Sequence, residues 1–505
     1  MKKLILLLLI AGLLIFYSCD NAPEEQPEPE TKPWFMVDRE ISADFMGMCH
    51  ISRRVNNTNF DFDTHEMRML SEMNVTWALH DLSWGFIQPT GPNDWNFDHD
   101  YIRPVVINAY NHGKKFFANM VYDVGWIHNS ALNGGIYGPS WTYITEEGRF
   151  QSPGSGRRIW EEQVPLYVNY VVETVREFHN YVGAWGIWNE PCNRPRFWTA
   201  SDEDFIYLTW QTVKGIRELE EELIREGHRT AEQQRIQIVI GGLSPLATPG
   251  FIRGLLDVEP ELRALADGIS YHPYSSSSVT TALVFESFRN TVEPFGFADK
   301  IWLTEVGYPT GGAYPSVVHP NFKASEVIKT LTELAIRGAV NAIWYHFMDD
   351  RTPATQDVAN SEHWFGLVLN PCYTPKTGAP AFAMWGRKIP GSRHEPNFPI
   401  SSNLPSAFRY HYFRGQNDEH YLIIWRDFPV PANVTITLPG TNQRVYITDA
   451  RTWPTDWNDA GPNTPLTIPN SRELGETSSH SVGPLAQFFV WENNDPTARP
   501  TISGN

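Results

Sequence analysis

The chain has 505 residues, and 41% of them are hydrophobic, so it can bury a large core. This length exceeds one small domain and suits one large domain with an accessory domain. The formal net charge is −18 and no basic run follows the N-terminal segment. Nucleic acid is therefore excluded as a partner, because phosphate binding needs clustered lysine and arginine.

The N-terminus has the features of an export signal. A basic start precedes the apolar run Leu4–Phe16, which is too short for a membrane-spanning helix. The cysteine after Ser18 resembles the lipobox of bacterial lipoproteins, which implies a signal peptide over residues 1–18 and a lipid on Cys19 that anchors the exported chain to the cell envelope. A plain signal peptide with an incidental cysteine is the alternative. Residues 19–34, rich in glutamate and proline, are predicted to be a disordered tether.

Three further cysteines, Cys49, Cys192 and Cys372, cannot all pair within one chain. Their spacing does not match a zinc motif. We therefore expect buried thiols or at most one disulfide.

After the tether, short apolar runs alternate with segments of helical periodicity. Strands are predicted at Asp44–Ile51, Val75–Leu82, Lys115–Tyr122, Gly183–Trp188, Ile236–Gly241, Asp267–His272, Lys300–Glu305 and Val340–Phe347. Helices are predicted at Thr64–Met73, Tyr101–His112, Pro165–Tyr181, Asp202–Arg225 with Asp202 as N-cap, Phe251–Leu265, Phe322–Arg337 and Thr377–Arg387. About eight β-then-α units predict an α/β fold, a (β/α)8 TIM barrel over residues 35–390. A doubly wound open sheet competes, but no GxGxxG follows the first strand.

Beyond residue 390 the pattern changes to short alternating strands. They are predicted at Phe408–Tyr412, Tyr421–Arg426, Val434–Leu438, Arg444–Asp449 and Gln487–Trp491. Turn residues separate these strands, which is typical of a small antiparallel β-sandwich. We place this accessory domain at 406–505, after a proline-rich linker over 391–405.

Two glutamates follow apolar strands of the predicted barrel. Glu190 lies in Trp185–Pro191, where proline ends the ladder, and Glu305 lies in Ile301–Gly307. Both should therefore lie at the C-terminal face of the barrel, where barrel enzymes carry their active sites. One such glutamate is usually a structural ion-pair partner, but two from different strands can face each other across a substrate. Cleavage of a glycosidic bond needs this arrangement, with one protonated and one ionised carboxyl.

These motifs resemble the clan A glycoside hydrolases, which carry Asn-Glu after barrel strand four and a second glutamate after strand seven. The resemblance implies that Glu190 is the acid/base, that Glu305 is the nucleophile and that Asn189 binds the sugar 2-hydroxyl. It also implies net retention of anomeric configuration, with carboxyl groups about 5 Å apart.

Within the clan, the chain is most similar to glycoside hydrolase family 39. The similarity lies in the runs Ile187–Pro191, Phe197-Trp198, Gly241-Gly242 and Asp267–Tyr274, and in the helix from Asp202 with Tyr207. Two features depart from the family. Cys192 stands where members often have asparagine, and Val306–Pro309 differs from the xylosidase members and is closer to endo-acting relatives. Another clan A family, such as family 5, is therefore the alternative.

Further residues at predicted strand ends are candidates for the cleft. Tyr274 could hydrogen-bond the nucleophile, and His272 could do so or bind substrate. The remaining candidates for sugar contact are His80, Trp84, Trp126, Trp344 and His346, because aromatic faces stack on sugar rings, although such residues also pack in cores. The insertion His128–Trp160 is predicted to form one wall of the cleft.

The sequence thus predicts an exported, retaining glycoside hydrolase that cleaves β-type O-glycosidic bonds in a polysaccharide or oligosaccharide. No cofactor is predicted, because side chains supply both the proton and the nucleophile. Asp349-Asp350 is interpreted as a solvated loop rather than a metal pair, and no metal is predicted. A catalytically silent carbohydrate-binding lipoprotein on the same barrel is the alternative from another functional class.

Overall fold

The computed structural model describes most of the chain outside its N-terminal segment and a few loops. The described residues are 37–51, 62–128, 143–144, 150–151, 159, 161–313, 317–370, 374–398, 400–402, 404, 407–427, 431–447, 472–475, 477–482, 484–493, 495 and 500–504. The predicted signal peptide and tether, with Cys19, Cys372 and most of the predicted insertion, lie outside them. Among the described helices, none combines the length and hydropathy that crossing a membrane requires.

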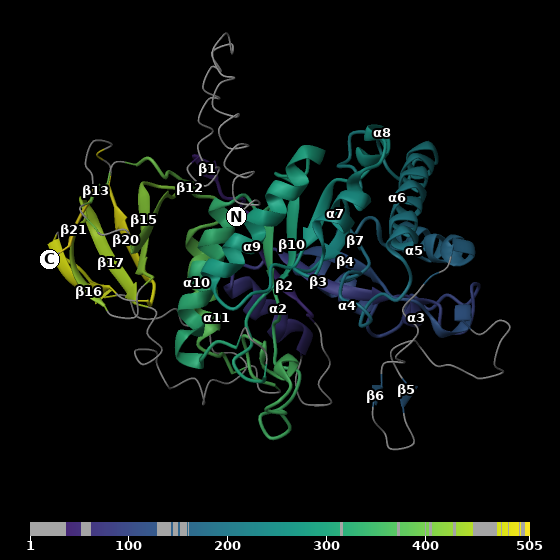
Figure 1. Cartoon of the computed structure of the whole chain (residues 1–505), viewed down its shortest axis with the longest axis horizontal. Coiled ribbons are helices and arrows are strands. Elements are labelled where there is room, and N and C mark those ends of the chain that lie inside the picture. Colours follow the sequence, from purple (N-terminus) through teal and green to yellow (C-terminus); the bar gives the residue numbers. More distant parts are fainter. Residues whose placement is uncertain are drawn as a thin grey trace, which may run out of the picture.

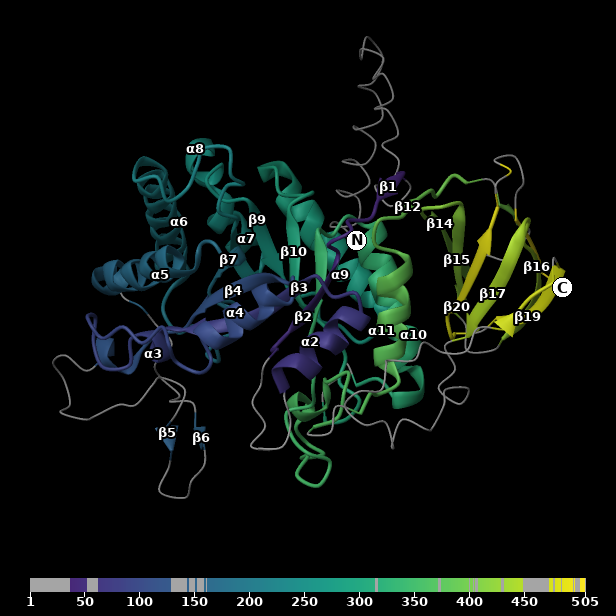
Figure 2. The same cartoon turned by 180° about the vertical axis from the view of Figure 1, so that it is seen from behind.

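Eight parallel strands close into a barrel (Figures 1 and 2). They are β2 Met46–Cys49, β3 Trp77–Ser83, β4 Lys115–Val121, β7 Val182–Ile187, β8 Ile238–Leu243, β9 Gly268–Tyr271, β10 Ile301–Val306 and β11 Asn341–Trp344. Each pairs in parallel with the next along the chain, and β11 closes onto β2. The predicted (β/α)8 barrel is confirmed, and the open doubly wound sheet is excluded.

Helices cover the outside of the barrel. They are α2 Phe62–Glu72, α3 Trp84–Ile87, α4 Arg103–Asn111, α5 Val164–Phe178, α6 Asp202–Arg225, α7 Pro249–Leu256, α8 Pro260–Arg263, α9 Ser278–Val292, α10 Pro320–Ile336 and α11 Gly378–Lys388. Short 3-10 turns lie at Gly125–His128, Glu161–Gln163, Glu293–Phe295 and Ser361–Trp364. A two-stranded ribbon joins β5 Tyr143–Ile144 to β6 Phe150–Gln151.

Three helical predictions needed correction. The predicted helix Phe251–Leu265 is split into α7 and α8, because a residue that precedes proline, here Glu259, disfavours helical geometry. Helix α9 was not predicted, although Ser277 forms a capping box with Thr280 at its start.

The third correction concerns the start of α6. Its N-cap is Ser201 rather than Asp202: the Ser201 hydroxyl accepts from the Asp204 N–H, and the Asp204 carboxylate accepts from the Ser201 N–H. This reciprocal pair satisfies two backbone donors that the helix start would leave unpaired.

The barrel interior is filled by side chains. Trp77 and Trp302 meet edge to face at 4.9 Å between ring centroids, and Leu79, Phe117, Val239 and Ile343 pack in the same cluster. These side chains leave no pore, so a ligand can enter the barrel only at an end.

Two antiparallel sheets form the C-terminal sandwich, as predicted. The larger sheet has the order β1-β12-β14-β15-β20-β17-β18 and the smaller has β13-β21-β16-β19. The bounds are β1 Arg39–Glu40, β12 Arg393–His394, β13 Ser401–Ser402, β14 Phe408–Arg414, β15 Glu419–Arg426, β16 Ala432–Thr437, β17 Thr441–Ile447, β18 Arg472–Glu473, β19 Thr477–Val482, β20 Gln487–Glu492 and β21 Thr501–Gly504.

The segment 391–405, predicted as a linker, carries β12 and β13, and β1 from the start of the predicted barrel domain also joins the larger sheet. The sandwich lies beside α10 and α11 (Figures 1 and 2). Trp425 and Phe488 belong to the same hydrophobic core as the barrel helices. The Ala486 N–H donates to Ser325 Oγ of α10 at 2.9 Å. Barrel and sandwich therefore share one core.

Candidate active site

Glu190 is held at the C-terminal end of β7 by an unusual backbone path. Trp188 and Glu190 have φ angles of 66° and 42°, in the left-handed region that side chains rarely adopt. The Glu190 N–H donates to the Gly242 carbonyl at 2.8 Å. Gly242 itself has a φ of 55°, and a Cβ there would lie 2.9 Å from the Trp188 carbonyl oxygen. Glycine at 242 thus allows the chain at the end of β8 to approach and fix Glu190.

Glu305 comes from β10. Trp302 of this strand faces the barrel interior, so strict alternation would turn Glu305 outward. The pairing of β10 with β11 shifts register between Leu303 and Val306, and Glu305 lines the pocket. Tyr274 Oη, at the end of β9, donates to Glu305 Oε2 at 2.9 Å, which is the contact that the sequence suggested.

His272 joins the two glutamates from below. Its Nδ1 lies 3.0 Å from Glu190 Oε1 and 3.7 Å from Glu305 Oε2. Its Nε2 lies 2.9 Å from Thr304 Oγ1, so both ring nitrogens are engaged. One oxygen of each glutamate and a ring nitrogen of His272 lie within 4.8 Å of one another. The two carboxyl groups, from different strands, thus face each other across a short distance.

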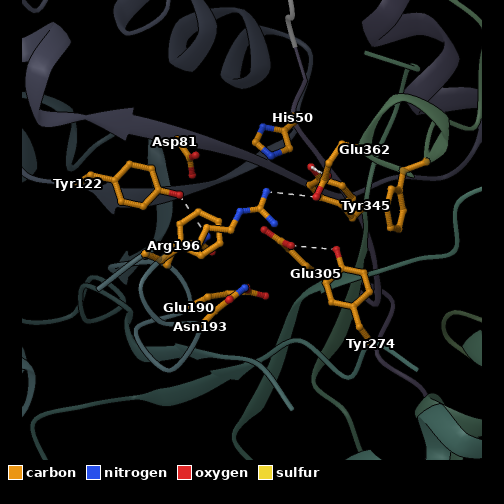
Figure 3. A pocket seen from close by; sticks show the side chains of 13 residues that line it. His50, Asp81, Tyr122, Glu190, Asn193, Arg196, Tyr274, Glu305, Tyr345 and Glu362 are labelled. Carbon is orange, nitrogen blue, oxygen red and sulfur yellow. Dashed lines mark hydrogen bonds and ion pairs between the residues drawn. The ribbon is translucent and has the colours of Figure 1, made fainter. Parts of the chain in front are cut away.

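A cavity of about 210 Å³ opens above this pair (Figure 3). Its lining residues are His50, Asp81, Tyr122, Asn189, Glu190, Asn193, Arg196, Phe197, Tyr274, Glu305, Tyr345, Glu362 and Phe365. Four of the predicted site residues, Asn189, Glu190, Tyr274 and Glu305, are brought together here. His272 is buried directly beneath them rather than exposed to the cavity.

An aromatic and a charged contact form the rim. Asn189 Nδ2 donates to Tyr122 Oη at 3.2 Å, and the Tyr122 ring lies parallel to Phe197 at 5.8 Å between centroids. Arg196 lies over Phe197 and pairs with Glu362 at 3.2 Å. This ion pair joins the loop after β7 to the loop after β11 (Figure 3).

Five predicted cleft residues do not reach the pocket. Trp84 is fully buried against Tyr170, and Trp126 packs edge-on against Trp84. Trp344 is fully buried beneath the helices, beside Tyr308 and Phe382. His80 is buried and is not among the lining residues, and the same holds for His346.

Neighbouring residues take the places of two of these. Asp81 and Tyr345 line the pocket, each one position after a predicted residue. Leu79 and Ile343 face the barrel interior, so Asp81 and Tyr345 share their face of the strand. The alternation of side chains along a strand, with a period of two residues, was the signal that could have identified Asp81 and Tyr345.

The interpretation of Asp349 as part of a solvated loop needs correction. Asp349 is instead almost fully buried, and it pairs with Lys376 at 2.9 Å between Nζ and Oδ1. Burial raises the pKa of this carboxyl, although Lys376 opposes the effect. The role is structural, because a buried charge needs such a partner.

The environments of the two glutamates push their proton affinities apart. Burial raises the pKa of Glu305 to about 7, and the charge of Glu190 adds to this while His272 opposes it. Burial acts on Glu190 in the same direction, but hydrogen bonds from His272 and Asn193 outweigh it and lower its pKa. The pKa of His272 is raised, because the two carboxylates outweigh its burial. In the free protein these environments therefore favour the protonated form of Glu305 and the ionised form of Glu190.

Two groups of side chains among the described residues have metal-binding donors close together. One is Glu190, His272 and Glu305, and the other is Cys49, His50 and Glu305. Neither Cys49 nor Cys192 is in a disulfide bond within the described residues, and Cys192 Sγ lies 3.3 Å from Ser244 Oγ.

Comparison with known proteins shows the fold but no sequence relative. No family model matches the chain, and no curated protein matches it in sequence. A family 39 glycoside hydrolase from Bacteroides cellulosilyticus has a similar structure: the TM-score is 0.59 at 19% identity, over 90% of this chain and 81% of that one. A family 39 enzyme from Xanthomonas axonopodis gives 0.54 at 11% identity, over 90% and 95%. The catalytic domain of a family 30 xylanase from Talaromyces cellulolyticus gives 0.52 at 14% identity, over 91% and 98%. The chain therefore shares its fold with these glycoside hydrolases.

Proposed function

We propose that the protein is a retaining glycoside hydrolase that cleaves β-type O-glycosidic bonds in a polysaccharide or oligosaccharide. The observation that carries this proposal is the pair of carboxyl groups within 4.8 Å, from two strands, at one end of the barrel. A separation near 5 Å suits double displacement, whereas an inverting enzyme needs about 6.5–9.5 Å to admit water between the carboxyls. The shared clan A fold supports the same conclusion.

In this mechanism Glu190 protonates the glycosidic oxygen while Glu305 attacks the anomeric carbon. The bond to the leaving sugar breaks and a glycosyl ester forms on Glu305. Glu190 then removes a proton from water, which hydrolyses the ester and restores both carboxyls. Tyr274 holds Glu305 by its hydrogen bond. Asn189, which lines the same pocket, is assigned the contact to the sugar 2-hydroxyl.

The assigned roles need the proton on Glu190, although the free protein favours it on Glu305. Both arrangements contain one proton, and the two carboxyls share His272, so they are two forms of one singly protonated pair. Positive charge that develops at the anomeric carbon beside Glu305 stabilises the ionised form of Glu305. The reaction itself therefore favours the form with the proton on Glu190.

This pair predicts a bell-shaped dependence of kcat/KM on pH. The rate falls as pH rises through about 7, because the pair then loses its one proton. The rate also falls on the acid side, at a pH below the usual range for glutamate, because Glu190 is then protonated and the pair carries two protons. Tyr274→Phe removes a hydrogen bond that lowers the pKa of Glu305, so the alkaline limb should move to higher pH. Initial rates across pH for both proteins test this, and an unmoved limb would contradict it.

Gly242→Ala tests the backbone that holds Glu190. We expect kcat/KM to fall by about 100-fold, because a displacement of roughly 1 Å at a catalytic group has this effect. Unfolding should become easier by about 1–3 kcal/mol, since alanine disfavours the left-handed backbone at this residue. The matched control is Gly254→Ala in α7, where a Cβ would lie 3.4 Å from Ile206 Cδ1. The account requires that the control keep its activity.

We also propose that the enzyme acts outside the cytoplasm, attached to the cell envelope through a lipid on Cys19. This rests on the N-terminal sequence alone: a basic start, a short apolar run and a cysteine after Ser18. Metabolic labelling with a radioactive or clickable fatty acid tests it. Labelling of the protein and its loss in Cys19→Ala are expected, and an unlabelled wild-type chain would disprove the anchor.

The function is tested by hydrolysis of a panel of aryl β-glycosides and polysaccharides. Glu305→Gln, which keeps the shape of the side chain, is the control for contaminating activity. Release of sugar by the wild type and not by the variant supports the proposal. Binding of glycans by both proteins without any release of sugar would show a silent carbohydrate-binding barrel instead.

A further inference from the structure

The top layer of the barrel interior places a thiol next to Glu305. Cys49 is the last residue of β2 and is fully buried beside Leu79 and Ile343. The next residue, His50, has a φ of 52° and lines the pocket. Figure 3 shows the His50 ring and the Glu305 carboxylate on the walls of the same cavity. Donor atoms of Cys49, His50 and Glu305 lie within 4.8 Å of one another.

These donors match the preferences of one class of metal. Zinc(II) binds thiolate, imidazole and carboxylate, and three such ligands plus a water form an open tetrahedral site. In such a site the ligand atoms are about 3.3–3.8 Å apart, given metal–ligand distances of about 2.0–2.3 Å. The donor atoms, which lie within 4.8 Å of one another, must therefore approach by at most about 1.5 Å to bind one ion. Calcium and magnesium are poor candidates, because they prefer oxygen ligands alone.

The charge of the pocket also favours a cation. Asp81, Glu190, Glu305 and Glu362 line it, and Arg196 is the one lining side chain among the described residues that is always cationic. A metal ion at Glu305 would therefore enter a predominantly acidic cavity rather than displace a cluster of positive charges.

We propose that Cys49, His50 and Glu305 form a binding site for zinc(II) that blocks the catalytic pocket. Binding converts the Cys49 thiol to a thiolate, and its proton leaves to solvent together with any proton that Glu305 carries. The metal then holds Glu305, so this carboxylate cannot attack a sugar. The binding site stands on the geometry alone, whereas the inhibition rests on the proposed hydrolase function.

Cobalt(II) is the probe that reports the site without activity. Titration of the purified full chain should give a near-ultraviolet sulfur-to-cobalt charge-transfer band that zinc(II) removes by competition. Cys49→Ala should abolish this band. Cys192→Ala, which removes the other cysteine thiol among the described residues, should keep it. Loss of the band in Cys49→Ala with an unchanged circular dichroism spectrum would assign the ligand.

Inhibition is measured separately, with an aryl glycoside. At a zinc(II) concentration of ten times Kd the wild-type rate should fall to about a tenth, since roughly nine-tenths of the sites are then occupied. Cys49→Ala should keep its metal-free rate and need at least about tenfold more zinc(II) for the same inhibition. A band that survives in Cys49→Ala, or equal inhibition of both proteins, would place the metal elsewhere, such as at Glu190, His272 and Glu305, and overturn the proposal. A normal cobalt band in a protein without hydrolase activity would keep the metal site and disprove only the proposed function.

Discussion

Glu305→Ala should lower kcat/KM by on the order of 10⁴-fold or more on every substrate, because the covalent intermediate can no longer form. The variant should still fold. It leaves the Tyr274 hydroxyl without its acceptor, at a cost of about 1–3 kcal/mol. It also removes a carboxyl group that lies close to Glu190, which relieves the repulsion that arises when both groups are ionised. Rates on an activated aryl glycoside, together with thermal unfolding, measure both effects.

A small anion gives this prediction a second readout. Azide can enter the space that Glu305→Ala leaves and attack the anomeric carbon from the same side. The product should be a glycosyl azide of opposite anomeric configuration to the substrate. The matched control is Glu177→Gln on the outer face of α5, where an ion pair with Arg103 at 2.7 Å is partly exposed. An active Glu305→Ala, or a loss of activity in the control as large as in Glu305→Ala, would refute the assignment.

The loss of activity in Glu190→Ala should depend on the leaving group of the substrate. Glycosides of acidic phenols need little protonation, so their cleavage should persist and deacylation should become limiting. Natural glycans leave as poor alkoxides, and their kcat/KM should fall by about 10²–10⁴-fold, the usual contribution of general acid catalysis. A plot of rate against the pKa of the leaving phenol, for wild type and variant, measures this difference.

If the two variants showed the opposite behaviour, the catalytic roles of the two glutamates would be exchanged. If Glu305→Ala kept its activity on activated phenols while Glu190→Ala lost all activity, Glu190 would be the nucleophile. The raised pKa of Glu305 would then belong to the acid, and its hydrogen bond from Tyr274 would position a proton donor. The two variants together therefore decide the assignment.

The sequence was sufficient for the barrel and for the glutamate pair, because both follow from local patterns. Apolar runs that end in Glu190 and Glu305 mark strand ends, and parallel strands bring their C-terminal ends to one face. The other site residues were harder to find for two physical reasons. Asp81 and Tyr345 needed the correct face of a strand, and a one-residue difference exchanges pocket for core. Arg196 and Glu362 lie in loops, where no periodicity predicts which residues meet.

The opposite error concerns tryptophans, which were predicted in the cleft but lie in the core. Trp84 and Trp344 stand at strand ends, but the space between strands and helices also needs large apolar side chains, and both fill it. Sugar stacking and core packing use the same flat apolar surface, so composition does not separate them. Among the lining aromatics, Tyr122, Phe197, Tyr345 and Phe365 were not predicted.

The stereochemistry of the first product tests the central claim most directly. Proton NMR of a β-glycoside during the first minutes of hydrolysis shows which anomer of the sugar is released, before mutarotation mixes the two forms. Attack by one glutamate and then by water from the opposite side predicts the β-anomer. Release of the α-anomer would show a single displacement, and the two glutamates could not then act as an acid/base and a covalent nucleophile.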